Sequence, residues 1–162
     1  MQKCAYIFPG QGAQYVGMGK SLYESFPQAR DIYDRASEIL KFDLKKLCFE
    51  GPAEELSSTK NSQIAILTTS LAALAVLNSL DNKRFVCAVT LGLSLGEYSA
   101  LVASGAMEFK DALFLVKKRG EFMEEASREN PGKMFSVIGL DKLKITEICK
   151  VTSCEIANLN CP

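Results

Sequence analysis

The sequence predicts the α/β class, with a parallel sheet in the longer first part of the chain and the start of a small α+β unit at its end. Two short apolar runs, residues 5–8 and 85–91, have the composition of buried strands. Each is followed by a glycine-rich turn and then by apolar residues at helical spacing. After residue 130 the pattern changes to a strand, a helix and a strand.

A linker divides the chain, which has 162 residues and is long enough for one domain or slightly more. The Asn-Pro-Gly-Lys segment at residues 130–133 has turn chemistry, so we place one domain at residues 1–130 and a shorter one at 131–162. The first part contains only two predicted strands, and a two-stranded sheet is seldom stable by itself. We therefore expect the chain to be part of a longer protein.

Helices are predicted between the two strands. Apolar side chains recur at helical spacing from residue 22 to residue 40, and Pro27 marks a break between two helices. Residues 42–47 fit one further helical turn, and residues 51–59 have the composition of a loop. Residues 62–79 predict a helix that is hydrophobic nearly all round and should therefore be buried on several sides.

Three further segments complete the predicted secondary structure. Residues 81–84 form a polar turn before the second strand, and residues 110–127 form a long amphipathic helix. After the linker, strands at 134–138 and 154–159 flank a helix at 140–150. This last pattern is the first half of a small α+β unit.

The second strand leads into a Gly-x-Ser-x-Gly motif, formed by Gly92, Ser94 and Gly96, and then into a helix that ends near residue 104. This order of strand, tight turn and helix is the context of a nucleophile elbow. The glycines allow a sharp turn, and the helix N-terminus supplies N–H groups and a positive dipole for a developing oxyanion. The alternative is that Ser94 merely occupies a glycine-rich turn.

The turn after the first strand, Pro-Gly-Gln-Gly-Ala-Gln at residues 9–14, is also rich in backbone freedom. It is not a dinucleotide-binding fingerprint, because Tyr15 stands where the third glycine would be required. It is suited to bringing a backbone N–H close to a ligand. The alternative is a plain connection between a strand and a helix.

A charged residue interrupts the apolar stripe of the long helix. The stripe is predicted to contain five inward-facing residues: Ala112, Leu115, Val116, Met123 and Ala126. Arg119 lies on it, three residues after Val116 and four before Met123. One interpretation is an arginine that pairs with a buried carboxylate or extends to water. The other is a bidentate clamp for the carboxylate of a ligand.

Charge and hydropathy exclude several functional classes. Lys+Arg and Asp+Glu are equal at 19 each, so no net charge favours nucleic acid or an anionic membrane surface. The N-terminal residues lead directly into a strand without the apolar region of a signal peptide. The apolar run at 64–77 is short and interrupted by hydroxyl residues, which favours a core helix over a membrane span. We expect a soluble, cytoplasmic protein.

The cysteines do not suggest a metal site. They form no Cys-x-x-Cys pair, and histidine is absent from the chain. Cys87 falls in the second predicted strand and Cys4 directly precedes the first, a setting in which a free cysteine behaves as a small hydrophobic residue. We expect no metal and reduced, buried thiols at all six positions: Cys4, Cys48, Cys87, Cys149, Cys154 and Cys161.

Three segments, taken together and in order, resemble the malonyl-CoA:acyl carrier protein transacylases of fatty acid biosynthesis. They are Phe-Pro-Gly-Gln-Gly-Ala-Gln at 8–14, Gly-Leu-Ser-Leu-Gly-Glu-Tyr at 92–98 and Lys-Arg-Gly-Glu-Phe-Met at 118–123. The resemblance extends over the whole chain, although family members are considerably longer. It implies a partial three-layer α/β-hydrolase-like core with a parallel sheet, followed by the truncated first half of a ferredoxin-like subdomain.

The resemblance implies an acyltransferase that works through a covalent serine ester. Ser94 would attack the malonyl thioester of coenzyme A, and the phosphopantetheine thiol of acyl carrier protein would then take the malonyl group. The backbone N–H groups of Gln11 and Leu95 would form the oxyanion hole. No cofactor is implied, since coenzyme A enters as part of the substrate, and the intact protein is expected to be a monomer.

The resemblance also assigns the residues that would hold the acyl group. Arg119 would bind the free malonyl carboxylate, which gives a purpose to a charge on an apolar stripe. Met123, one helical turn further on, would form a wall of the same pocket, and Asn160 would approach it.

The chain departs from the family pattern at two points. Leu93 stands where the family usually has a histidine, and the family's catalytic base is a histidine in the C-terminal half, whereas this chain has none. General base assistance contributes about 10²–10⁴-fold to such reactions, so we expect these residues alone to turn over malonyl-CoA slowly. Two other functions remain open: a serine esterase or thioesterase that shares the elbow, and a catalytically inactive relative that binds acyl carrier protein.

Overall fold

The computed structural model describes residues 2–80 and 84–160. Its backbone contacts divide the chain into two compact units, Met1–Asn130 and Pro131–Pro162, which are described separately. The boundary falls within the segment where the sequence places a linker. Most of the polar turn predicted at 81–84, and Cys161, lie outside the described residues.

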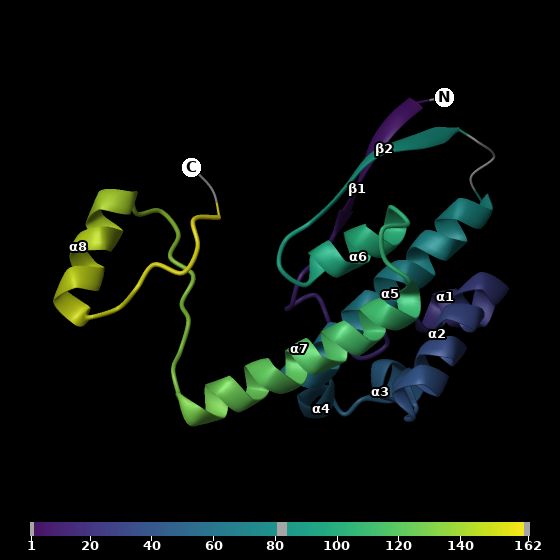
Figure 1. Cartoon of the computed structure of the whole chain (residues 1–162), viewed down its shortest axis with the longest axis horizontal. Helices are drawn as coiled ribbons and strands as arrows, with labels where there is room; N and C mark the ends of the chain where they lie inside the picture. Colours follow the sequence, from purple (N-terminus) through teal and green to yellow (C-terminus); the bar gives the residue numbers. More distant parts are fainter. Residues whose placement is uncertain (1, 81–83, 161–162) are drawn as a thin grey trace. The chain divides into compact units, whose positions relative to one another are not determined.

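Figure 1 shows the elements in chain order. The first unit contains two strands and seven helices in the described part of the chain, and the second contains one helix. The elements of the first unit are β1 (Gln2–Phe8), α1 (Lys20–Ser25), α2 (Pro27–Leu40), α3 (Leu44–Glu50), α4 (Ala53–Ser57), α5 (Thr59–Leu80), β2 (Phe85–Gly92), α6 (Gly96–Ala103) and α7 (Phe109–Glu129); the second unit contains α8 (Lys142–Thr152).

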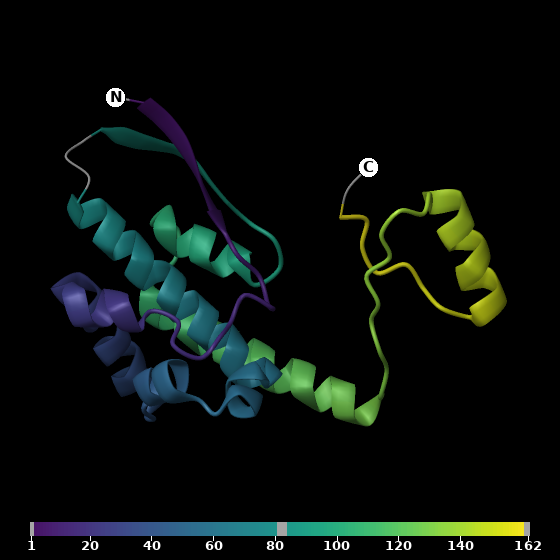
Figure 2. The ribbon, with the colours of Figure 1, turned by 180° about the vertical axis from the view of Figure 1, so that it is seen from behind.

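The two strands form a parallel pair, which confirms the predicted α/β class with a parallel sheet. Their register runs from Gln2 opposite Phe85 to Phe8 opposite Gly92, with an irregularity between Cys4 and Ala5. In the views of Figures 1 and 2 the strands lie side by side, and α6 packs against both of them. Because parallel strands end at the same edge of a sheet, the turns that follow β1 and β2 begin next to each other.

Helix α5 is the centre of the hydrophobic core. Its seven residues from Ser62 to Thr68 are all buried, and it packs against α2, α6 and α7. Among the described residues it is the one helix long and apolar enough to cross a membrane, a test that core helices also pass. Its burial on several sides supports the prediction of a core helix.

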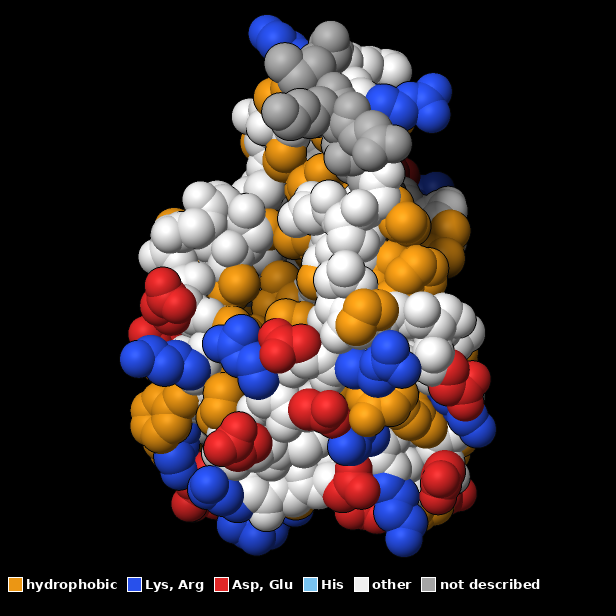
Figure 3. All heavy atoms as spheres, turned by 90° about the vertical axis from the view of Figure 1, so that its right-hand side faces the viewer, with side chains coloured by type: hydrophobic (Ala, Val, Ile, Leu, Met, Phe, Trp, Pro, Cys, Tyr) orange, Lys and Arg blue, Asp and Glu red, His pale blue; other side chains and the backbone are white. Residues whose placement is uncertain are grey.

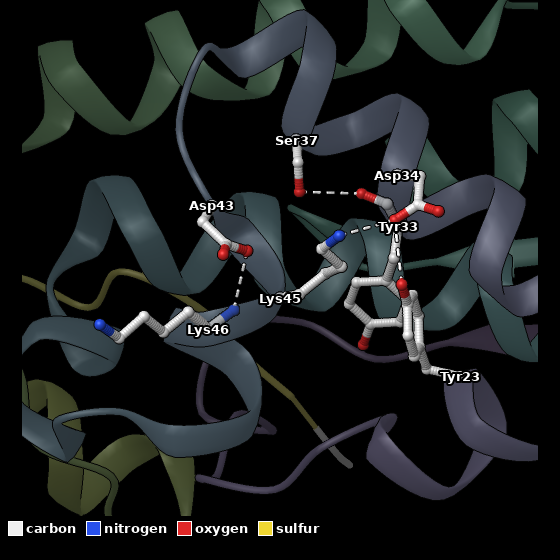
Figure 4. A network of polar contacts seen from close by, with 7 residues as sticks. All are labelled: Tyr23, Tyr33, Asp34, Ser37, Asp43, Lys45 and Lys46. Carbon is white, nitrogen blue, oxygen red and sulfur yellow. Dashed lines mark hydrogen bonds and ion pairs between the residues drawn. The ribbon is translucent and has the colours of Figure 1, made fainter.

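A polar network joins helices α1, α2 and α3. The Lys45 ammonium lies 2.8 Å from Asp34 Oδ1, and the Tyr23 hydroxyl donates to the same oxygen at 3.2 Å. Figure 4 shows that these three side chains come from three different helices, α1, α2 and α3. The Tyr33 ring packs against Tyr23 and Phe49 beneath them. The network therefore fixes α1, α2 and α3 relative to one another.

The surface of the molecule mixes apolar and charged side chains. On the face drawn in Figure 3, hydrophobic side chains lie in a hollow in the upper half, and basic and acidic groups alternate over the lower half. A cleft of about 450 Å³ is lined by residues of β1 and α5, among them Ile7 and Leu77. The charges are interspersed, which agrees with the balanced composition.

The prediction of a loop at residues 51–59 is wrong, because these residues contain the short helix α4 (Ala53–Ser57). Leu56 is its buried residue, and Glu54 and Glu55 occupy its first turn, where acidic side chains favour a helix N-terminus. A helix of five residues is too short to show the periodicity by which helices are recognised.

The predicted inward stripe of α7 is correct only in part. Its buried residues are Phe109, Ala112, Leu113, Val116 and Gly120. Leu115, Met123 and Ala126 are exposed instead. Figures 1 and 2 show that the last turns of α7 extend beyond the other helices of the first unit, which explains the exposure of Ala126. Met123 lies at the edge of the contact with α5, where its sulfur meets Gln63, and Leu115 lies on a face of α7 that the described residues leave exposed.

The prediction that the thiols are buried is also wrong for most cysteines. Cys48 is buried, Cys4 and Cys149 are half-buried, and Cys87 and Cys154 are exposed. Cys87 is exposed because, within residues 2–80 and 84–160, β2 pairs with β1 alone and most of its side chains reach the surface.

The second unit contains α8, whose N-terminus is capped by Asp141, with a carboxylate oxygen 2.9 Å from the Lys144 nitrogen. The strands predicted at residues 134–138 and 154–159 are not formed. A strand is stable when its backbone groups pair with a neighbour, and the described part of this unit supplies no partner for either segment.

Candidate active site

The backbone at Ser94 is held in an unusual conformation. Its φ is 55°, in the left-handed region that residues with a Cβ rarely adopt. Lys41 and Ser153 share this conformation in the described residues, but both are C-caps at the ends of helices, where it is common. Ser94 instead lies between the end of β2 and the start of α6, as expected for a nucleophile elbow.

The two glycines of the motif are required by crowding. A Cβ on Gly92 would lie 2.1 Å from the carbonyl carbon of Gly96, and a Cβ on Gly96 would lie 2.4 Å from the carbonyl oxygen of Phe8. Both neighbours are backbone atoms, which have little freedom to move. The glycines therefore let the turn close on itself and let α6 start directly against the end of β1.

The turn after β1 lies against the elbow. A Cβ on Gly10 would lie 3.4 Å from the carbonyl oxygen of Leu93. Among residues 2–80 and 84–160, no hydrogen bond occupies the backbone N–H of Gln11 or of Leu95. The backbone N–H groups of Gly96 and Glu97, which follow Leu95, donate to carbonyl oxygens of the elbow at residues 93 and 94. Two N–H groups are thus left available at the edge of the sheet where Ser94 lies.

The side chain at position 93 takes no part in the turn. Leu93 is 68% exposed, and its contribution to the elbow is its carbonyl oxygen, which accepts the Gly96 N–H at 3.0 Å. Any residue supplies that carbonyl. The departure from the family's histidine is therefore compatible with the geometry of the elbow.

Arg119 extends from α7 to the side chain of Ser94. Its Nη2 donates to Ser94 Oγ at 2.6 Å, and its Nη1 donates to Gln63 Oε1 at 2.5 Å. The side chain is half-buried, and no carboxylate forms an ion pair with it in the described part of the chain. Of the two interpretations of this arginine, pairing with a buried carboxylate is not observed. The positive charge beside Ser94 therefore has no counter-charge among the described residues.

Gln63 is the site residue that the sequence analysis missed. It is a fully buried residue of α5 whose amide nitrogen also donates to the Met123 sulfur at 3.3 Å. Met123 is 41% exposed, so it forms an edge of this cluster. The signal was present: a glutamine at the start of an almost entirely apolar helix needs a buried partner.

The described residues offer no base for Ser94. The hydrogen bond made by Ser94 Oγ comes from Arg119, which cannot accept a proton. Asn160 is exposed and belongs to the second unit, so its place in the pocket stays a prediction. The arrangement therefore supplies a nucleophile, available N–H groups and an anion-binding cation, and it lacks a proton acceptor in the described part of the chain.

Comparison with known proteins gives a consistent result. Residues 5–156 match the model of the acyl transferase domain family. Over its whole length the chain is 49% identical to a malonyl CoA-acyl carrier protein transacylase of Bacillus subtilis (strain 168), of which it covers 52%. It is 46% identical to the protein of the same name from Staphylococcus aureus (strain MRSA252), of which it covers 53%. The chain thus spans about half the length of these relatives.

Solved structures agree with these relatives. An acyl carrier protein S-malonyltransferase from Vibrio cholerae superposes with a TM-score of 0.84 at 40% identity, over 93% of this chain and 48% of that one. A malonyl-transacylase in complex with its type II polyketide synthase acyl carrier protein gives a TM-score of 0.81 at 37% identity, over 94% and 48%.

Proposed function

Because the chain belongs to the acyl transferase domain family, we propose that it transfers a malonyl group from coenzyme A to the phosphopantetheine thiol of acyl carrier protein, in fatty acid biosynthesis. The observation that carries this proposal is the Arg119 guanidinium, 2.6 Å from Ser94 Oγ and bonded to uncharged groups. A malonyl thioester has a free carboxylate a short distance from its reactive carbonyl. A cation beside the nucleophile suits such a substrate.

The proposed reaction has two half-reactions. The Ser94 oxygen attacks the thioester carbonyl, the carbon–sulfur bond breaks, and coenzyme A leaves as the thiol with the proton that the serine lost. The thiol of acyl carrier protein then attacks the seryl ester, and Ser94 recovers its proton as the new thioester forms. Splitting the transfer in this way is the usual advantage of covalent catalysis.

Each half-reaction passes through a tetrahedral intermediate with a negative oxygen. We assign its stabilisation to the backbone N–H groups of Gln11 and Leu95, which are not otherwise bonded in the described residues. The N-terminus of α6 adds a favourable dipole. Loss of one such donor typically costs about 10²–10³-fold in rate.

The acyl pocket is proposed to include Met123, whose sulfur contacts the amide that holds Arg119. Asn160 is proposed as a further pocket residue on the basis of the family resemblance alone. The chain contains no histidine, so proton transfer from Ser94 depends on solvent or on a group outside the described residues. We therefore propose that this chain by itself is acylated slowly.

The substrates and partners follow from the relatives. Malonyl-CoA is the proposed donor, and the complex of a similar transacylase with its acyl carrier protein supports acyl carrier protein as the acceptor. Neither nucleic acid nor a membrane is proposed as a partner, and the intact protein is proposed to be a cytoplasmic monomer.

The finer description of the fold is also a proposal. We propose that β1, β2 and the helices around them form part of a three-layer α/β-hydrolase-like core, and that residues 131–162 begin a ferredoxin-like subdomain. The Pro131–Pro162 unit would then acquire its strands only when further strands pair with it.

The test is the intact mass of the protein after incubation with malonyl-CoA. We expect a slow gain of one malonyl group that maps to Ser94 and is absent from Ser94→Ala. Acetyl-CoA should load less than malonyl-CoA. Hydrolysis of simple esters without stable acylation would favour a serine esterase, and binding of acyl carrier protein with no acylation at any time would favour an inactive relative. Either result would contradict the proposal.

A further inference from the structure

We infer that Gln63 is the residue that positions Arg119 for the substrate carboxylate, an inference that rests on the proposed function. Gln63 lies on α5 and is fully buried, whereas Arg119 and Met123 lie one turn apart on α7. The amide of Gln63 contacts both of them. Its oxygen accepts from Arg119 Nη1 at 2.5 Å, and its nitrogen donates to the Met123 sulfur at 3.3 Å.

The orientation of this amide follows from its partners. A guanidinium carries donors and no acceptor, so only the oxygen of the amide is able to face it. The nitrogen then points to the Met123 sulfur, a weak acceptor. Each end of a buried polar group is thereby satisfied, and burial without such partners would be costly. The amide is consequently held in one orientation, with its acceptor toward Arg119.

The contact depends on a close approach of the two helices. Gly120 follows Arg119 in the sequence, and a Cβ on Gly120 would lie 2.7 Å from the Lys60 Cα on α5. Lys60 is three residues before Gln63, so it lies one turn away on the same helix. The absence of a side chain at Gly120 therefore brings the backbone of α7 near enough for Gln63 to reach the guanidinium.

The neutrality of Gln63 is the functional point. A glutamate at this position would hold the guanidinium equally well but would neutralise it, and the substrate carboxylate would then compete with an internal one. A glutamine fixes Nη1 and leaves the positive charge available. The Nη2 group, now bonded to Ser94 Oγ, remains free to exchange that hydroxyl for an incoming carboxylate.

The experiment measures the binding of malonyl-CoA and acetyl-CoA by calorimetry in the Ser94→Ala background, in which neither thioester is consumed. Gln63→Glu tests the charge, and Gln63→Met removes the acceptor at similar volume. We expect Gln63→Glu to weaken malonyl-CoA binding at least about tenfold and Gln63→Met to weaken it about threefold to tenfold. Acetyl-CoA, which lacks the carboxylate, should change less than about twofold in both.

The matched control is Thr68→Val. Thr68 is buried on the same helix, and its hydroxyl has no hydrogen-bond partner among the described residues. Its replacement should leave the binding of both ligands unchanged. Thermal unfolding of every variant shows whether it is folded. If Gln63→Glu does not fold, the binding of the two thioesters to Gln63→Met decides whether Gln63 positions Arg119.

The outcomes separate this inference from the proposed function. If the Ser94→Ala parent binds malonyl-CoA no better than acetyl-CoA, the proposed function is wrong and this inference with it. If the parent prefers malonyl-CoA but the Gln63 variants keep that preference, or weaken both ligands equally, the function stands and the positioning role of Gln63 is overturned.

Discussion

Two cations of this protein, Lys45 and Arg119, are held in opposite ways. Lys45 lies 2.8 Å from the Asp34 carboxylate in the network between α1, α2 and α3. This hydrogen bond raises the pKa of the Lys45 ammonium. Arg119 is bonded to a hydroxyl and an amide, and no carboxylate of the described residues neutralises it.

The difference indicates what each cation is for. The charge of Lys45 is largely neutralised by Asp34, and the pair joins α2 to α3. An unpaired, half-buried charge beside a serine hydroxyl is costly to keep, and an anionic ligand would offset that cost. The following variants test this distinction, from the largest expected effect to the smallest.

Arg119→Ala should have the largest effect. We expect acylation of Ser94 by malonyl-CoA to fall about 10²-fold or more, because a charge-assisted interaction with the carboxylate is lost. Acylation by acetyl-CoA should be retained. Intact-mass time courses with each thioester measure both rates. An equal loss with the two substrates would contradict the assignment of Arg119 to the carboxylate.

Gly96→Ala should disrupt the turn that holds Ser94 beside Arg119. Its new methyl group would lie 2.4 Å from the Phe8 carbonyl oxygen, so we expect a loss of about 1–3 kcal/mol in the free energy of unfolding, together with loss of acylation. Chemical denaturation measures the first quantity. Gly132→Ala is the control, since a Cβ there meets nothing within 4 Å, and its stability should be unchanged.

The free energy of unfolding should depend on pH through Cys48, which lies on α3 near Lys45. Burial raises the pKa of the Cys48 thiol from 9.0 to about 12. Above about pH 9 the unfolded chain releases this proton while the folded chain keeps it. The contribution of Cys48 to the free energy of unfolding is therefore fully present below pH 9 and is lost as the pH rises toward 12. The expected loss is at most about 1.4 kcal/mol per pH unit.

Denaturation curves between pH 8 and 11 measure this loss, with Cys48→Ala as the reference. The buried Tyr33 hydroxyl, whose pKa burial also raises, adds a similar loss above its ordinary value in both proteins. The slope should be smaller in Cys48→Ala. An identical slope in the two proteins would contradict the assignment to Cys48.

Asp34→Asn should have the smallest effect. It removes the partner of Lys45, but the pair is partly exposed, and such pairs contribute about 0–1 kcal/mol. We expect a change of that size in the free energy of unfolding and unchanged acylation by malonyl-CoA. A large loss of acylation would show that this network supports the active site, and the contrast between the two cations would fail.

The sequence was most informative where local chemistry decides the structure. The apolar run at 85–91 and the Gly-x-Ser-x-Gly motif predict the strand, turn and helix around Ser94, and the structure shows that backbone crowding requires Gly92 and Gly96 there. Arg119 was recognised because a charge on an apolar stripe is rare. Both features act within a few residues, and the spacing of side chains reveals them.

The rest depends on contacts between distant segments. Gln63 was missed because α5 is apolar on nearly every side, so its pattern does not indicate which residue faces α7. The exposed end of α7 and the unformed strands at 134–138 and 154–159 were predicted wrongly for a related reason. Apolar composition shows that a segment would be stabilised by packing against another element, but it does not show whether the described chain supplies that element.

The left-handed backbone at position 94 has a consequence for how this protein balances folding against chemistry. Glycine would adopt that conformation with less strain than any residue that has a Cβ, yet glycine offers no hydroxyl. The strain at Ser94 is therefore set during folding, before any ligand binds. The hydroxyl of Ser94, the proposed nucleophile, is thus oriented in advance, and the rest of the scaffold must be stable enough to offset that cost.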